Sequence, residues 1–162
     1  MITFRKIGLP AFLLFIACSM AAQVRQGDAA PEIALPGING DTIRLSSLKG
    51  KVVLIDFWAA WCGPCRAANK QMVKLYPKYK ERGFEILGVS LDDSKNAWIK
   101  AVKKDKITWL QVIDNGGWQA KTARRWNIYQ LPTSYLVDKD GTLIAMDPEP
   151  KELEKMLNLL LE

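Results

Sequence analysis

Two cysteines separated by two residues are the part of the sequence best suited to chemistry. Cys62 and Cys65 stand in the run Trp61-Cys62-Gly63-Pro64-Cys65. A thiolate attacks a disulfide, and a neighbouring thiol can complete the exchange. A bond between these cysteines closes a very small loop and therefore adds little stability by restricting the unfolded chain. The pair indicates a redox site rather than a structural crosslink.

The residues around the pair place it where a strand ends and a helix begins. Val52 to Trp58 is a nearly unbroken apolar run, typical of a strand buried on both faces, and residues 65–79 carry apolar residues at helical spacing. The first turn of a helix offers unpaired N–H groups and a positive dipole end, which lower a thiol pKa. Cys62 is therefore predicted to be the attacking thiol and Cys65 the more buried one.

Three further residues of this stretch are predicted to serve the cysteines. Gly63 leaves access to the first sulfur, and Pro64 fits an early helical position because its missing N–H costs little there. Asp56 lies in the apolar strand, where burial would raise its pKa and suit it to exchange a proton with Cys65. The alternative is that the strand turns Asp56 toward solvent.

The run from Asp56 to Cys65 resembles thioredoxin, and residues 27–162 resemble the exported TlpA/ResA branch of that family. The resemblance implies an α/β thioredoxin fold, in which helices flank a central mixed sheet and the chain adds an N-terminal hairpin and a helical insertion. It also implies that Pro132 follows a cis peptide bond beside the dithiol. Leu131 would then pair its backbone with an extended substrate segment. Trp61 could offer a flat apolar surface to the same substrate polypeptide.

Two positions depart from the branch that the chain resembles. Ala68 and Lys70 stand where relatives often carry a glutamate and a proline. Because the helical glutamate is missing while Asp56 is present, proton transfer is expected to resemble that of thioredoxin. The Gly-Pro pair between the cysteines is similar to that of reducing thioredoxins.

Other elements follow from hydrophobic patterning and turn residues. The expected elements are a hairpin over residues 30–45, a strand over 84–91, a helix starting near residue 94, a strand over 109–113, a helix over 117–126, a hairpin over 134–145 and a C-terminal helix from Pro150. Apart from Trp61, the tryptophans, including Trp118, are interpreted as packing residues.

The N-terminus has the composition of an export signal. Arg5 and Lys6 precede a short apolar stretch, so residues 1–22 are predicted to be a signal peptide and residues 23–162 the thioredoxin-like domain. The apolar stretch is shorter than the roughly 20 residues that span a bilayer. A lipoprotein signal, with a lipid attached to Cys18, is the alternative to simple cleavage. Either version predicts a periplasmic location.

Charge and composition exclude several functions. Removing Arg5 and Lys6 with the signal, and no acid, lowers the formal charge from +6 to +4, and the remaining charges are interspersed, so nucleic-acid binding is not indicated. The chain has 3 cysteines and no histidine, a poor ligand set for tetrahedral zinc. We expect no metal and no cofactor, and a monomer.

The sequence favours an exported thiol-disulfide oxidoreductase that reduces protein disulfides. By resemblance, its partners would be disulfide-bonded or thiol proteins and a membrane thiol donor of the CcdA/DsbD kind, in cytochrome c maturation or envelope disulfide reduction. One alternative is a peroxiredoxin-like thiol peroxidase, which shares the opening Ala30-Pro31-Glu32-Ile33 but needs a threonine or serine where Ala59-Ala60-Trp61 stands. Another is a non-catalytic thioredoxin-fold binding module.

Overall fold

A five-stranded mixed sheet forms the centre of the protein, in a computed structural model that describes residues 24–162. The strand order is β5-β4-β3-β6-β7. The middle strand, β3 (Val52–Trp58), runs parallel to β4 (Phe84–Ser90) and antiparallel to β6 (Thr133–Val137). The predicted thioredoxin fold is confirmed, whereas the predicted signal peptide and Cys18 lie outside the described residues.

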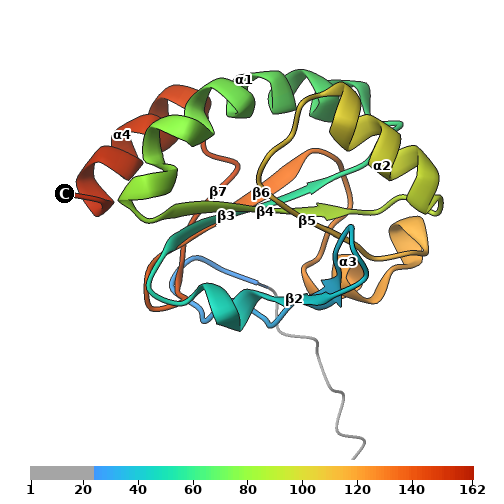
Figure 1. Cartoon of the computed structure of the whole chain (residues 1–162). Coiled ribbons are helices and arrows are strands. Elements are labelled where there is room, and N and C mark those ends of the chain that lie inside the picture. The colour runs from blue at the N-terminus through green and yellow to red at the C-terminus, as the bar shows by residue number, and fades with distance from the viewer. Residues whose placement is uncertain (1–23) are drawn as a thin grey trace, which may run out of the picture.

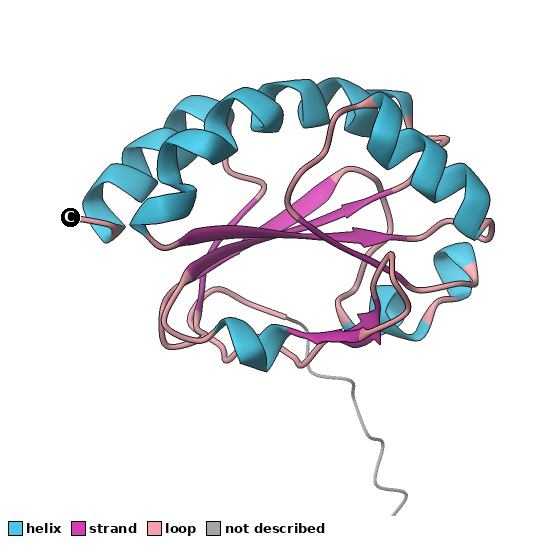
Figure 2. Ribbon diagram, viewed as in Figure 1, coloured by secondary structure: helices cyan, strands magenta, loops and turns pink. Residues whose placement is uncertain are grey.

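Helices cover one face of the sheet and the N-terminal extension covers the other (Figures 1 and 2). The upper layer in these views contains α1, α2 and α4. The lower layer contains the small sheet β1-β2 and α3. The remaining bounds are β1 (Ala34–Pro36), β2 (Thr42–Arg44), η1 (Leu45–Leu48), α1 (Gly63–Tyr79), η2 (Lys80–Arg82), α2 (Lys95–Lys104), β5 (Leu110–Ile113), η3 (Gly117–Gln119), α3 (Lys121–Arg125), β7 (Leu143–Met146) and α4 (Pro150–Leu160).

The apolar run of β3 is explained by these two layers, because both of its faces are covered. Val53, Ile55 and Phe57 belong to the core beneath the sheet. Val52 and Leu54 belong to the core beneath α1 and α4. Since side chains alternate along a strand, Asp56 shares the helix-covered face with its neighbours at even positions.

The helix predicted over residues 117–126 is wrong as a single element. The structure has the short turn η3 followed by α3. Gly116 and Gly117 both adopt positive φ angles, 117° and 52°, so a regular helix does not begin at residue 117. Ala120, between the two pieces, has ψ 138°, an extended conformation. Within residues 24–162, no helix is long and apolar enough to cross a membrane.

Candidate active site

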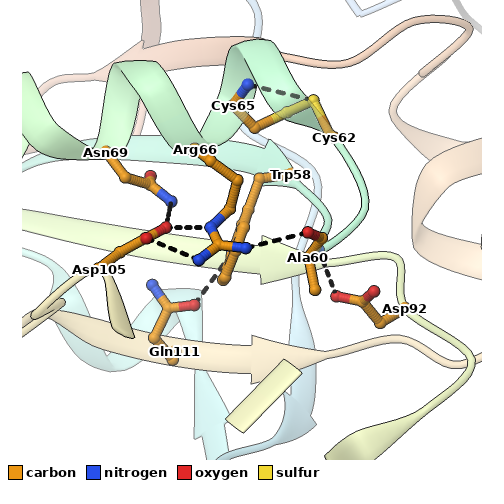
Figure 3. A network of polar contacts seen from close by, with 9 residues as sticks. All are labelled: Trp58, Ala60, Cys62, Cys65, Arg66, Asn69, Asp92, Asp105 and Gln111. Atoms are coloured by element: carbon orange, nitrogen blue, oxygen red, sulfur yellow. Dashed lines mark hydrogen bonds and ion pairs between the residues drawn. A yellow bond between two sulfur atoms is a disulfide. The ribbon is translucent and has the colours of Figure 1, made fainter. Parts of the chain in front are cut away.

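Cys62 and Cys65 are joined by a disulfide at the start of α1 (Figure 3). Their Cα atoms lie 5.3 Å apart. Cys62 is the N-cap of α1, and its Sγ accepts a hydrogen bond from the backbone N–H of Cys65 at 3.2 Å. Pro64 occupies the first turn, as predicted. After reduction, the helix N-terminus would stabilise a thiolate on Cys62.

Access to the two sulfurs is unequal. Cys62 is 5% exposed and Cys65 is 1% exposed, so the second cysteine is the more buried, as predicted. Gly63 and Pro64 are exposed beside them, and no atom lies within 4 Å of where a Cβ on Gly63 would be. A large substrate can therefore approach Cys62 over this turn.

The loop before β6 forms the opposite wall of the site. The Leu131-Pro132 peptide bond is cis, which confirms the prediction from the resemblance. Leu131 packs against the core cluster that contains both cysteines. Pro132 lines a pocket together with Asp56. The cis-proline loop thus contacts the dithiol cluster through Leu131 and the pocket of Asp56 through Pro132.

Asp56 lines a pocket of about 440 Å³ between α1, the cis-proline loop and the start of α4. Burial, followed by the negative charge of Asp147, raises the pKa of Asp56 to about 7. The raised pKa agrees with the sequence prediction. Of the residues that the structure describes around this pocket, none is cationic. They are Leu54, Asp56, Ala68, Gln71, Met72, Gln130, Pro132, Ser134, Asp147, Pro148, Glu149, Pro150 and Leu153.

Asp147 is held close to Asp56 through the strand that lies between them. Ser134 pairs with Asp56 across β3 and β6. Asp147 Oδ1 accepts hydrogen bonds from Ser134 N at 2.6 Å and from Ser134 Oγ at 3.4 Å. The backbone N–H of Asp147 donates to Ser134 O at 2.8 Å. Sequence reasoning missed Asp147, because only the strand register places it near the site.

A second polar network fixes the backbone that precedes Cys62 (Figure 3). Arg66 donates to both carboxylate oxygens of Asp105, with Nη2 at 2.7 Å from Oδ1, and its Nη1 donates to Ala60 O at 3.1 Å. Ala60 N donates to Asp92 Oδ2 at 2.8 Å, and Asn69 donates to Asp105 at 3.4 Å. Burial alone would raise the pKa of Asp105, but hydrogen bonds from Arg66 and Asn69 lower it.

A buried glutamine supports the tryptophans below the site. Gln111 Oε1 accepts hydrogen bonds from Trp58 Nε1 at 3.0 Å and from Trp98 Nε1 at 3.4 Å. A Cβ on Gly88 of the neighbouring strand would lie 2.1 Å from Gln111 Nε2, so glycine provides the space for this side chain. No motif in the sequence indicated Gln111.

The tryptophans divide into two groups. Trp58, Trp98, Trp109 and Trp126 are buried, in agreement with their interpretation as packing residues. Trp61 is 58% exposed beside Cys62, and Trp118 is 43% exposed, which corrects its interpretation as a packing residue. The rings of Trp61 and Trp118 meet edge to face with centroids 6.1 Å apart. Trp118 lies outside the core because it belongs to the short turn η3, which has no buried residues.

Comparison with known proteins supports the same assignment. The sequence family described as AhpC/TSA matches residues 26–146, which is most of the chain. The chain belongs to the AhpC/TSA family. It is 40% identical over 118 residues to the thiol-disulfide oxidoreductase ResA of Bacillus thuringiensis subsp. konkukian, covering 73% of this chain and 66% of that protein. It is 35% identical over 138 residues to ResA of Bacillus anthracis, covering 85% and 77%.

Solved structures of thiol-disulfide oxidoreductases have the same fold. A thiol-disulfide oxidoreductase from Bacteroides fragilis superposes with a TM-score of 0.78 at 36% identity, covering 83% of this chain and 100% of that one. The thioredoxin domain of a thiol-disulfide oxidoreductase from Bacteroides vulgatus superposes with a TM-score of 0.79 at 32% identity, covering 86% and 100%. Within its family, the chain therefore belongs with the ResA-type thiol-disulfide oxidoreductases.

Proposed function

We propose that this protein reduces protein disulfides by two-step thiol-disulfide exchange through Cys62 and Cys65. The observation that carries the proposal is the Cys62–Cys65 disulfide at the N-terminus of α1, with the cis-proline loop packed beside it. A crosslink over this short separation contributes little to stability, so its main use is chemical. The raised pKa of Asp56 supports the same reading.

In the first step, the reduced protein attacks with Cys62. Its thiolate forms a bond to one sulfur of the substrate disulfide, and the other substrate sulfur leaves as a thiolate that takes up a proton. The helix N-terminus around Cys62 favours the attacking thiolate. The product is a mixed disulfide between Cys62 and the substrate.

In the second step, Cys65 releases the substrate. Asp56 accepts the proton of the Cys65 thiol, and the resulting thiolate attacks the Cys62 sulfur. The substrate then leaves with two electrons gained, and the protein is left with the Cys62–Cys65 disulfide. A pKa near 7 lets Asp56 accept this proton and lose it again at neutral pH. Regeneration needs a dithiol donor.

The substrate would bind over the exposed residues around Cys62. Leu131 would pair its backbone with an extended segment, and Pro132 would pack near the sulfurs. Gly63 and Pro64 would border the approach to Cys62, and Trp61 would contact apolar side chains. Exposure of Trp61, Gly63 and Pro64 supports this arrangement.

The cellular setting is part of the proposal. Residues 1–22 would direct export to the periplasm, with Cys18 as the site of a lipid anchor if one is attached, and residues 23–162 would act as one monomeric domain. Electrons would come from a membrane thiol donor of the CcdA/DsbD kind. Substrates would be apocytochrome c or wrongly oxidised envelope proteins. The composition of residues 1–22 and the similarity to ResA-type thiol-disulfide oxidoreductases support this setting.

The reduction potential of the Cys62–Cys65 couple tests the direction of electron flow. Tryptophan fluorescence of the mature protein, equilibrated in thiol buffers, would report the couple because Trp58 and Trp61 lie beside it. A value near about −270 mV, like that of thioredoxin, supports a reductant. A value near about −120 mV, like that of DsbA, reverses the assignment to disulfide donation. Absence of a reversible couple contradicts any catalytic role.

Serine variants of the two cysteines distinguish the proposed oxidoreductase from the two alternative functions. Cys65→Ser should accumulate a mixed disulfide with protein substrates, whereas Cys62→Ser should trap none. Peroxide consumption that survives Cys65→Ser would instead favour a peroxiredoxin-like thiol peroxidase, which the shared opening Ala30-Pro31-Glu32-Ile33 keeps as the second candidate. Partner binding unchanged in the double variant would favour a non-catalytic binding module.

A further inference from the structure

An aromatic pair lies exposed at the reactive cysteine. Trp61 directly precedes Cys62, and its ring meets that of Trp118 at 6.1 Å with an angle of 60°. Both side chains retain large exposed fractions. Within residues 24–162, none of the three hydrophobic core clusters includes either ring. Much of both rings thus lies outside the core, and together they form one continuous apolar surface.

The turn that carries Trp118 is fixed by its own backbone. Gly116 and Gly117 adopt φ angles of 117° and 52°, which residues with a Cβ rarely adopt. Gly116 N donates to Asp93 Oδ1 at 3.1 Å, and Gln119 N donates to Gly116 O at 2.8 Å. These contacts hold η3 against the segment after β4. Trp118 is thus presented at the surface by a defined turn and not by a loose loop.

The position of the pair determines what covers it. Cys62 is almost buried, so a substrate disulfide must come very close to the surface around it before the sulfurs can react. Trp61 lies next to Cys62 in sequence and its side chain is exposed, so a polypeptide bound at Cys62 lies close to the Trp61 ring. The Trp61 ring contacts Trp118, so a side chain that packs on Trp61 has the Trp118 ring within reach.

We propose that Trp118 and Trp61 together bind a large apolar side chain next to the reactive cysteine of an extended, disulfide-bonded polypeptide. This inference rests on the proposed function and adds a substrate preference to it. Aromatic surfaces that become fully covered contribute much of the affinity at protein interfaces. The protein accordingly prefers unfolded segments that expose apolar residues beside a disulfide over small disulfides and polar segments.

Two disulfide-bonded peptides of equal length provide the test. One carries phenylalanine next to its cysteine and the other carries serine, with oxidised glutathione as the small disulfide. Trp118→Ala is expected to lower kcat/KM for the phenylalanine peptide roughly tenfold, to change the serine peptide little, and to leave oxidised glutathione and the reduction potential unchanged. Trp118→Phe keeps an aromatic ring and should retain most of the preference.

A matched control is Leu159→Ala, since Leu159 is an exposed apolar side chain on α4, at the opposite end of the molecule from the start of α1 (Figure 1). It should change none of the three rates. Equal losses on all three substrates with Trp118→Ala, or no loss on the phenylalanine peptide, overturn the inference. So does a wild-type dimer that Trp118→Ala converts to a monomer, because a second copy would then be the occupant. If the wild-type protein reduces none of the three disulfides, the proposed function itself is wrong, and this outcome differs from a loss that is seen only in Trp118→Ala.

Discussion

The carboxyl group of Asp56 shares its pocket with other acids and with no cation among the described lining residues. Asp147 and Glu149 are the other charged residues of that lining, and Asp147 is the one whose charge raises the pKa of Asp56. The elements that face Asp56 from α1 contribute Ala68, Gln71 and Met72, which are uncharged. The pKa of Asp56 is therefore set by burial and by Asp147.

Asp147→Asn should move the pH dependence of substrate release. The change removes a negative charge but keeps a side-chain oxygen that can accept from Ser134, so the pKa of Asp56 should fall from about 7 while burial keeps it above its ordinary value. A base works when deprotonated, so activity rises with pH through its pKa, and this limb should shift to lower pH. Single-turnover release of the thiol product from a disulfide-bonded peptide, by the reduced protein with both cysteines intact and measured against pH, reports the shift.

Glu149→Gln serves as the control for that titration. Glu149 lines the same pocket, but its charge is not among the causes of the raised pKa. Glu149→Gln should therefore leave the pH dependence of substrate release unchanged. A profile that moves equally in both variants, or in neither, would show that Asp147 does not control the proton acceptor.

At the scale of elements, Arg66 joins three segments around the dithiol. It lies on α1, pairs with Asp105 at the C-terminal end of α2, and donates to the carbonyl of Ala60 just before Cys62. The side chains of Arg66 and Asp105 are only 22% and 5% exposed. Because a largely buried carboxylate needs its partner, this contact is worth more than a surface ion pair.

Arg66→Met should therefore lower the free energy of unfolding by about 2–3 kcal/mol, since Asp105 and the Ala60 carbonyl each lose a donor. It should also speed amide hydrogen exchange in the segment from Ala60 to Cys62. Lys78→Met offers a comparison, because the Lys78–Glu154 pair is well exposed and should contribute less than about 1 kcal/mol. Urea unfolding of both variants measures these changes. If the free energy of unfolding falls by a similarly small amount in both, the role given to Arg66 is contradicted.

How far the sequence predicts these elements depends on whether the determining contacts are local. The apolar run of β3 and the spacing in α1 are local patterns, and both elements lie where the sequence placed them. Asp56 was identifiable as a charge in an apolar run. The Arg66–Asp105 contact joins residues 39 positions apart, and only the packing of α2 on α1 brings them together. Trp118 was misread because tryptophan composition alone does not reveal exposure.

At the scale of the whole molecule, the N-terminal extension crosses one face of the sheet from edge to edge. Ala29 bridges to Thr142, just before the edge strand β7, and Gly37 bridges to Val112 on the other edge strand, β5. Between these points, Ile33 packs into the core beneath β3. The extension thus covers apolar surface and protects sheet edges that would otherwise be open to pairing. The hairpin was predictable from its turn, but its contacts with both edges were not.

Ile33→Ala should separate stability from chemistry. Ile33 is 1% exposed and shares a core cluster with Val53, Ile55 and Phe57, so the truncation should lower the free energy of unfolding by about 2–5 kcal/mol. Ile38→Ala, in the exposed turn of the same hairpin, should change it by less than about 0.5 kcal/mol. The dithiol belongs to a different cluster on the helix-covered face, so neither variant should shift the reduction potential. Denaturant unfolding and redox titration test both expectations, and a potential that moves with Ile33→Ala would mean that the extension also tunes the active site.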